Sequence, residues 1–174
     1  MEFSLKNKVV LITGASRGIG EATAIGLAQA GADVAIASRK LPDLEKVADQ
    51  IKKTGRKCVP VAAHVGKTEE INSLVKRVLE EFGKIDILVN NAATNPSIAP
   101  AIDIDERAWD SIMNLNLKGL FFLSQTVARG MKEKGGGKII NVSSVAGITP
   151  DILPAAPAAR REAARAQREP ELVP

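Results

Sequence analysis

Apolar residues along the chain fall into two kinds of pattern that alternate with each other. Short runs rich in valine, isoleucine and alanine have the length and β-branched content of buried strands, and they lie at 8–12, 33–37, 57–63, 85–89 and 138–142. Apolar stripes with helical spacing separate them, over 22–30, 43–53, 68–82 and about 106–133. Strands that alternate with helices predict a parallel sheet with helices on both faces.

A glycine-rich turn joins the first strand to the first helix, with Gly14, Gly18 and Gly20 inside the segment 13–20. Gly14 allows the tight turn, Gly18 lets the backbone come close to a pyrophosphate, and Gly20 has no Cβ to hold the helix off the strand. The helix N-terminus adds free N–H groups and a partial positive charge of about half a unit. This combination is typical of a dinucleotide-binding βαβ unit; a turn that holds no ligand is the alternative.

Together these features predict one doubly wound, Rossmann-like α/β domain over residues 1–150, with about five parallel strands in an order like 3-2-1-4-5. Pro60 favours an edge position for the third strand, because proline has no N–H for pairing. The fifth strand would form the other edge, where Ile139, Ile140 and Val142 lose covering layers. An apolar edge of this kind recruits other chains, so we expect self-association.

Composition narrows the class of protein. The 174 residues are 45% hydrophobic and 25% charged, with a net charge of +4, which suits one soluble globular domain. Basic and acidic residues are interspersed, so nucleic acid is not an expected partner. The one cysteine, Cys58, excludes an internal disulfide and indicates a reducing, cytoplasmic compartment. We expect no membrane span and no metal site.

The amino-acid composition of the chain changes after residue 150. Residues 151–174 hold four prolines, seven alanines and four arginines, with no glycine and no aromatic residue. A helix here would have no apolar face wide enough to cover a sheet. We therefore expect a solvated or disordered, irregular tail.

Four motifs in order resemble the short-chain dehydrogenase/reductase family over roughly residues 5–153. They are TGASRGIG at 13–20, NNAA at 90–93, Asn116 within NLNLKG, and NVSSVAG at 141–147. The segments HVGK and NAATNP are similar to its carbonyl-reductase-like branch. The resemblance implies NAD(P)(H)-dependent interconversion of alcohols and carbonyls on a small-molecule substrate.

The resemblance also implies roles for individual residues. The pyrophosphate and adenosine would be held by Gly14, Ser16, Arg17, Gly18, Ile19 and Gly20, the adenine side by His64 and Val65, and the nicotinamide ribose by Asn91, Ala92 and Ala93. Ser144 would polarise a substrate carbonyl and Asn116 would hold a water in the proton relay. The alternatives are a turn or cap serine for Ser144 and a helix-kink residue for Asn116.

Two positions predict NADP(H) rather than NAD(H) as the cofactor. Sites that prefer NAD place a carboxylate at the end of the second strand to accept the ribose hydroxyls, and here that place is Ser38. Arg39 follows it and Arg17 rises from the glycine turn, so two guanidiniums would flank a 2′-phosphate. Two solvated loop arginines are the alternative.

The chain departs from the family at the proton donor. The family tyrosine and lysine fall at Pro157 and Arg161, and the chain contains no tyrosine at all. The family also continues with further strands and a substrate loop, so a shifted reading frame, an alternative end or a truncated copy would each explain the change.

Three hypotheses follow from this departure. The first is an NADP(H)-type oxidoreductase by descent with its catalytic half lost. The second is a non-catalytic nucleotide-binding module, in some cases a partner of full-length homologues. The third is a product that folds poorly and has no function.

Overall fold

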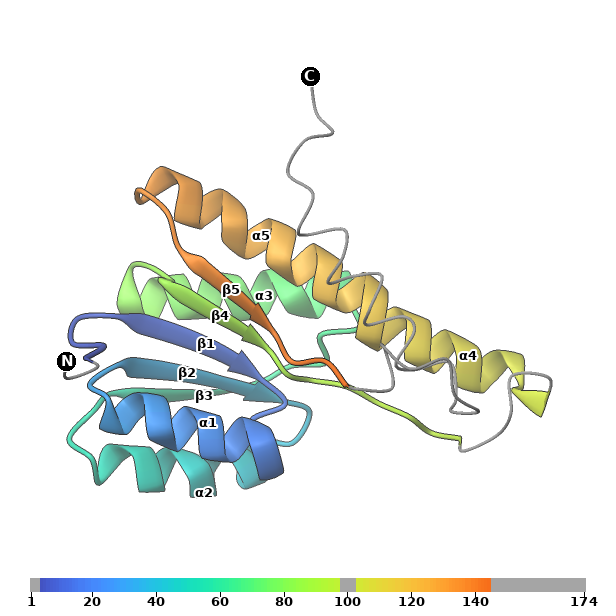
Figure 1. Cartoon of the computed structure of the whole chain (residues 1–174), viewed down its shortest axis with the longest axis horizontal. Helices are drawn as coiled ribbons and strands as arrows, with labels where there is room; N and C mark the ends of the chain where they lie inside the picture. Colours follow the sequence, from blue (N-terminus) through green and yellow to red (C-terminus); the bar gives the residue numbers. More distant parts are fainter. Residues whose placement is uncertain (1–3, 98–102, 145–174) are drawn as a thin grey trace.

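The computed structural model of the chain describes residues 4–97 and 103–144 (Figure 1). Strands and helices alternate along it as the apolar pattern predicts. The strands are β1 (Val9–Thr13), β2 (Asp33–Ser38), β3 (Cys58–Ala62), β4 (Ile87–Asn90) and β5 (Lys138–Asn141). The helices are α1 (Gly18–Gln29), α2 (Leu41–Lys52), α3 (Thr68–Phe82), α4 (Glu106–Ile112), the π-helix η2 (Met113–Gly119) and α5 (Leu120–Glu133).

The strands form one five-stranded parallel sheet in the order β3-β2-β1-β4-β5, which confirms the predicted α/β class and strand order. Pro60 lies in β3, which is an edge strand within the described residues, as predicted. The strand order reverses beside β1, since β2 extends the sheet on one side and β4 on the other. The connections after the adjacent strands β1 and β4 lead to helices on opposite faces of the sheet, α1 and α5, and a ligand-binding crevice is expected between them.

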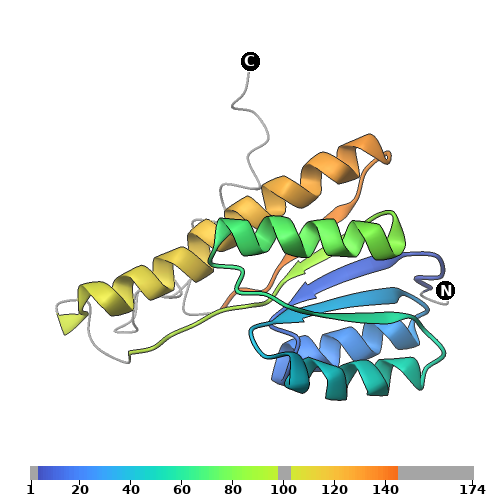
Figure 2. The same cartoon turned by 180° about the vertical axis from the view of Figure 1, so that it is seen from behind.

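Two apolar layers cover the two faces of the sheet (Figures 1 and 2). Helices α1 and α2 pack on one face and α3 and α5 on the other. The strand β1 is buried at all five positions because it is central and covered on both sides. Its residues divide between the layers, with Val10 and Ile12 on the α1–α2 face and Leu11 on the α3–α5 face.

The edge strand β5 is covered unevenly. Ile139 packs with the layer under α3 and α5, and Val142 packs with the layer under α1 and α2. Both are partly buried, so each keeps some cover from its own face, and the loss of further covering layers stays a prediction. Ile140 alone of the three is an exposed large apolar side chain, at 50% exposure. Self-association through this edge stays a prediction.

The long helical segment after β4 differs from its sequence-based prediction. The pattern predicts ordinary helix over about 106–133, but residues 113–119 form a π-helix between α4 and α5. Gly119 explains part of this, because a Cβ at Gly119 would collide with the carbonyl oxygen of Val65. The wider turn of the π-helix places Gly119 directly against the loop after β3, and a glycine has no side chain that would separate the two backbones.

Helix α1 begins four residues before the predicted apolar stripe, at Gly18 instead of residue 22, and the other element bounds differ from prediction by at most two residues, as expected where helix and strand ends fray. The predicted domain boundary at 150 and the tail 151–174 lie outside the described residues. No helix in the described ranges is long and apolar enough to cross a membrane.

Candidate functional site

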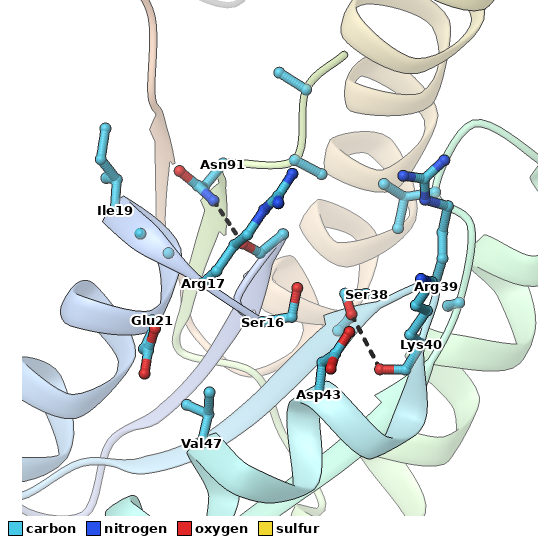
Figure 3. A pocket seen from close by; sticks show the side chains of 18 of the residues that line it. Ser16, Arg17, Ile19, Glu21, Ser38, Arg39, Lys40, Asp43, Val47 and Asn91 are labelled. Carbon is cyan, nitrogen blue, oxygen red and sulfur yellow. Dashed lines mark hydrogen bonds between the residues drawn. The ribbon is translucent and has the colours of Figure 1, made fainter.

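A pocket of about 890 Å³ opens at the carboxyl ends of the central strands (Figure 3). It lies between the glycine turn after β1, the end of β2, and the segments that follow β3 and β4. Every residue predicted to bind a cofactor lines it: Gly14, Ser16, Arg17, Gly18, Ile19, Gly20, Ser38, Arg39, His64, Val65, Asn91, Ala92 and Ala93. Sequence positions that lie far apart thus meet at one opening, at the point where the strand order reverses.

The glycine turn is closely packed on one side and open on the other. Gly14 has a φ of 66°, and a Cβ there would lie 2.8 Å from the Cα of Ala92. A Cβ at Gly20 would collide with the carbonyl of Gly14 and the amide of Asn91, so this glycine keeps α1 close to the turn and to the segment after β4. Gly18 has a φ of 59°, and among the described residues outside its own stretch of chain no atom lies within 4 Å of the place of a Cβ. A pyrophosphate would find open space and exposed backbone at Gly18.

Thr13 and Asn91 hold the glycine turn against the end of β4. The hydroxyl of Thr13, which is buried, accepts hydrogen bonds from the backbone N–H groups of Asn91 and Ala92, both at 3.1 Å. The side-chain amide of Asn91 donates to the carbonyls of Thr13 at 3.0 Å and Gly14 at 3.1 Å. Sequence reasoning missed Thr13, although its place directly before the first glycine was a usable signal.

A second buried network joins β4 to β5 and α5. The amide nitrogen of Asn90 donates to the hydroxyl of Ser124 at 2.8 Å and to the side-chain oxygen of Asn141 at 2.9 Å. Asn90 and Asn141 are also partners in the strand register. Asn141 is the last residue of β5, so these hydrogen bonds position the end of that strand and, with it, the start of the segment that leads to Ser144.

Asn116 ties the π-helix to the segment after β4. Its side chain is buried, accepts a hydrogen bond from the N–H of Thr94 and donates one to the carbonyl of Thr94, each at 2.9 Å. Thr94 lines the pocket, so the hydrogen bonds of Asn116 to Thr94 position that part of the pocket wall although Asn116 does not line it. Asn116 and Ser144 do not themselves appear among the described lining residues, and Ser144 is exposed beyond the end of β5.

We expect Asn116→Ala to lower the free energy of unfolding by about 2–4 kcal/mol, because the N–H and carbonyl of Thr94 lose their partners in a partly buried place. Asn114→Ala is the matched control, since Asn114 lies in the same π-helix and is exposed; it should change stability by less than about 0.5 kcal/mol. Urea unfolding measures both. Equal effects of the two substitutions would contradict a structural role for the Asn116 amide.

The loop after β3 is held by the carboxylate of Glu70 and by the side chain of His64. The backbone N–H of His64 donates to Glu70 at 2.7 Å, and Nδ1 of His64 accepts from the N–H of Gly66 at 3.1 Å. The backbone hydrogen bond from His64, together with Lys67, holds the pKa of the Glu70 carboxyl below its ordinary value. This support for the loop is present above the ordinary carboxyl pKa and is lost as the pH falls through the lowered one.

Cations gather at the end of the pocket where α2 begins. Arg39 and Lys40 directly precede α2, and the side chain of the N-cap residue Lys40 makes no capping hydrogen bond. Arg17 and Lys46 line the same pocket, while Asp43 and Glu21 are its acids. Cations beside a helix N-terminus are unfavourable, because the helix dipole is positive at that end. An anionic group would relieve this repulsion. Sequence reasoning found Arg17 and Arg39 but not Lys40, Asp43 or Lys46.

Within the described residues, no group of three or more histidine, cysteine, aspartate or glutamate side chains is arranged to hold a metal ion. The glycine turn, the helix N-terminus and the cluster of cations at the switch point of the parallel sheet are together the arrangement of a nucleotide-binding crevice.

Comparison with known proteins agrees with this class. The family profile described as short chain dehydrogenase matches residues 8–165, which extends beyond the end near Leu153 that the motifs predict. The chain therefore belongs to the short-chain dehydrogenase family.

Two curated relatives illustrate the extent of the similarity. The 2-dehydro-3-deoxy-D-gluconate 5-dehydrogenase of Dickeya dadantii (strain 3937) is 42% identical over 144 residues, which cover 82% of this chain and 56% of the relative. Dehydrogenase/reductase SDR family member 4 of Oryctolagus cuniculus is 38% identical over 146 residues, which cover 84% of this chain and 56% of the relative. The chain thus spans about half the length of the curated relatives it matches.

Solved structures resemble the fold closely. An NAD+-bound xylitol dehydrogenase superimposes with a TM-score of 0.89 at 31% identity, covering 97% of this chain and 64% of the other. A metagenomic short-chain oxidoreductase in complex with NADP superimposes with a TM-score of 0.88 at 31% identity, covering 95% and 75%. Relatives of this chain therefore bind NAD or NADP.

Proposed function

We propose that this chain is the cofactor-binding part of an NADP(H)-dependent short-chain oxidoreductase that acts on small alcohols or carbonyls, and that the 174-residue chain by itself is inactive. The observation that carries the proposal is the convergence of all the predicted cofactor residues on one pocket. The segments HVGK and NAATNP support the carbonyl-reductase-like branch, and similarity to 2-dehydro-3-deoxy-D-gluconate 5-dehydrogenase keeps the substrate open within the class.

The residues of the pocket fit a dinucleotide. Gly14 and Gly20 permit contacts that a Cβ would block, and the open face at Gly18 leaves room for a pyrophosphate beside the N-terminus of α1. Asn91, Ala92 and Ala93 would hold the nicotinamide ribose, and His64 and Val65 the adenine side. The cofactor, when bound, supplies or accepts a hydride.

The preference for NADP(H) rests on the charges around the end of β2. Ser38 stands where a carboxylate would accept the ribose hydroxyls, and its hydroxyl donates to the carbonyl of Lys40 at 3.5 Å. Arg39 and Lys40 meet the N-terminus of α2 at the same place, with Arg17 opposite on the glycine turn (Figure 3). A 2′-phosphate would be held by guanidinium groups and would offset the repulsion between these cations and the helix dipole.

A non-catalytic nucleotide-binding module is the second candidate. The absence of tyrosine from the chain, with Pro157 and Arg161 at the family positions of tyrosine and lysine, favours it. Such a module would bind the same cofactor and regulate or pair with a full-length homologue. Turnover of the chain extended by the C-terminal segment of a relative would support the first candidate, and binding to a full-length homologue would support the second. Cofactor binding is common to both.

Titration calorimetry with NADPH and NADH tests the proposal. We expect the chain to bind NADPH at least tenfold more tightly than NADH, since one charge-assisted arginine–phosphate bond contributes about 1.5–3 kcal/mol. Bound NADPH should also raise the unfolding temperature, because it binds only the native state. Equal or tighter binding of NADH would contradict the preference, and no binding of either would contradict nucleotide binding itself.

A further inference from the structure

One acid of the pocket has no role in the proposed function. Asp43 lies in the first turn of α2 and lines the pocket together with Ser16 and Ser38. Figure 3 shows its carboxylate directed toward the opening at which these two serines lie. The side chain of Asp43 is 47% exposed, and its ion pair within the described residues is a long one, 3.9 Å to Nζ of Lys46 on the next turn of the helix.

The place of Asp43 in the first turn of α2 explains why an acid occurs there, but not why its carboxylate faces the pocket. An acid in the first turn stabilises a helix through its dipole, and that effect does not depend on which ligand the pocket holds. Because the carboxylate of Asp43 is directed toward the pocket, it would also act on a bound ligand. A carboxylate beside the adenosine ribose accepts hydrogen bonds from ribose hydroxyls, which is the role that an acid at the end of β2 has in NAD-binding sites.

That usual acid is replaced here by Ser38. Asp43 therefore supplies a carboxylate to the same end of the pocket from a different element, α2 instead of β2. The ionised carboxylate repels the negative 2′-phosphate, while the cations Arg17, Arg39 and Lys40 attract it.

We propose that Asp43 is a specificity-determining residue that opposes the 2′-phosphate of NADP(H) and favours the free 2′-hydroxyl of NAD(H). The chain then discriminates less strongly between the two cofactors than its arginines and lysines alone would dictate. This inference rests on the proposed binding of a dinucleotide in the pocket.

The test measures the dissociation constants of NADPH and NADH for the wild-type chain and for Asp43→Asn by titration calorimetry. Removal of one like charge near the phosphate is expected to tighten NADPH about tenfold. NADH should weaken by about threefold, because its ribose hydroxyls exchange a charged carboxylate acceptor for the weaker, neutral amide oxygen of asparagine. The change in the NADPH/NADH ratio should shrink as the salt concentration rises, since the repulsion is screened.

Glu45→Gln is the matched control. Glu45 is an exposed acid on the same helix and is not among the described residues that line the pocket, so the same change of charge should leave the ratio within about twofold of wild type. Asp43→Glu keeps the charge and should stay closer to the wild-type ratio than Asp43→Asn. Asp43→Ser supplies a second neutral variant, since serine is also tolerated at a helix start.

An NADPH/NADH ratio within about twofold of wild type in both Asp43→Asn and Asp43→Ser would overturn the inference while leaving the proposed function intact. Failure of the wild-type chain to bind either nucleotide would overturn both. Thermal unfolding without ligand, measured for each variant, separates a weaker helix from a changed affinity. A variant that unfolds in the absence of ligand is replaced by the other neutral one.

Discussion

The 174-residue chain, mixed with NADPH and a panel of reactive diketones and aldehydes, is expected to consume no cofactor at an enzymatic rate. Reduction of a carbonyl leaves an alkoxide that needs a proton as it forms, and a positioned acid accelerates such a step by about 10²–10⁴-fold. Pro157 has no proton to give, and Arg161 cannot reproduce the fit of a lysine ammonium. The hydroxyl of Ser144 donates hydrogen bonds but is too weak an acid to replace a tyrosine.

The absorbance of NADPH at its nicotinamide band measures this result, and a faint rate through water protonation is compatible with it. A turnover near the enzyme median of about 10 per second would contradict it. Pro157→Tyr with Arg161→Lys, made in a chain extended by the C-terminal segment of a relative, should restore activity.

In that restored chain, Ser144→Ala should lower turnover by at least about 10²-fold, because the substrate carbonyl loses its hydrogen-bond donor. Ser143→Ala is the matched control, since Ser143 is the neighbouring exposed serine on the same segment after β5. Equal losses in the two variants would contradict the assignment of Ser144.

The second large effect concerns the arginines of the pocket. We expect the double substitution Arg17→Ser and Arg39→Ser to weaken NADPH binding about 100-fold, because each charge-assisted bond to the 2′-phosphate contributes at least about 1.5 kcal/mol. NADH has no such phosphate, so its affinity should change by less than about threefold. Titration of both nucleotides measures the two effects.

Arg129→Ser is the control for a general change of charge. Arg129 is exposed on α5, outside the described lining of the pocket, and donates at 3.3 Å to Gln125. Its removal should change neither affinity beyond about twofold at moderate salt. A parallel fall of NADPH and NADH affinity in the double variant would mean that the arginines serve the pyrophosphate common to both, and the preference for NADP(H) would lose its support.

Local sequence patterns were sufficient for the elements and for the glycine turn, whereas His64, Val65, Asn91, Ala92 and Ala93 of the pocket were predicted from the resemblance to the family. Strands are recognisable here because β1, β2 and β4 are buried on both faces and so read as unbroken apolar runs, and Pro60 marks an edge because proline cannot pair on both sides. The glycine turn is visible in the same way, since positive φ angles at Gly14 and Gly18 require glycine. Each of these signals depends on a residue and its near neighbours only.

Contacts between segments that lie far apart in the sequence could not be predicted from such local patterns. The π-helix at 113–119 depends on the approach of Gly119 to Val65 and on the hydrogen bonds of Asn116 to Thr94. The place of Thr13 before the first glycine is visible in the sequence, but its hydrogen bonds with the N–H groups of Asn91 and Ala92 became visible only in the structure. A long-range hydrogen bond leaves no periodicity in the sequence.

The sequence by itself thus determined the alternation of strands and helices, the glycine turn and the absence of a tyrosine, because backbone conformation, burial and residue identity are encoded position by position. The tertiary structure alone decided that α2 brings Asp43 and Lys46 to the pocket beside Arg17 and Arg39. Which side chains share one opening depends on how parallel strands and their helices pack side by side, and that packing joins residues that no local pattern relates.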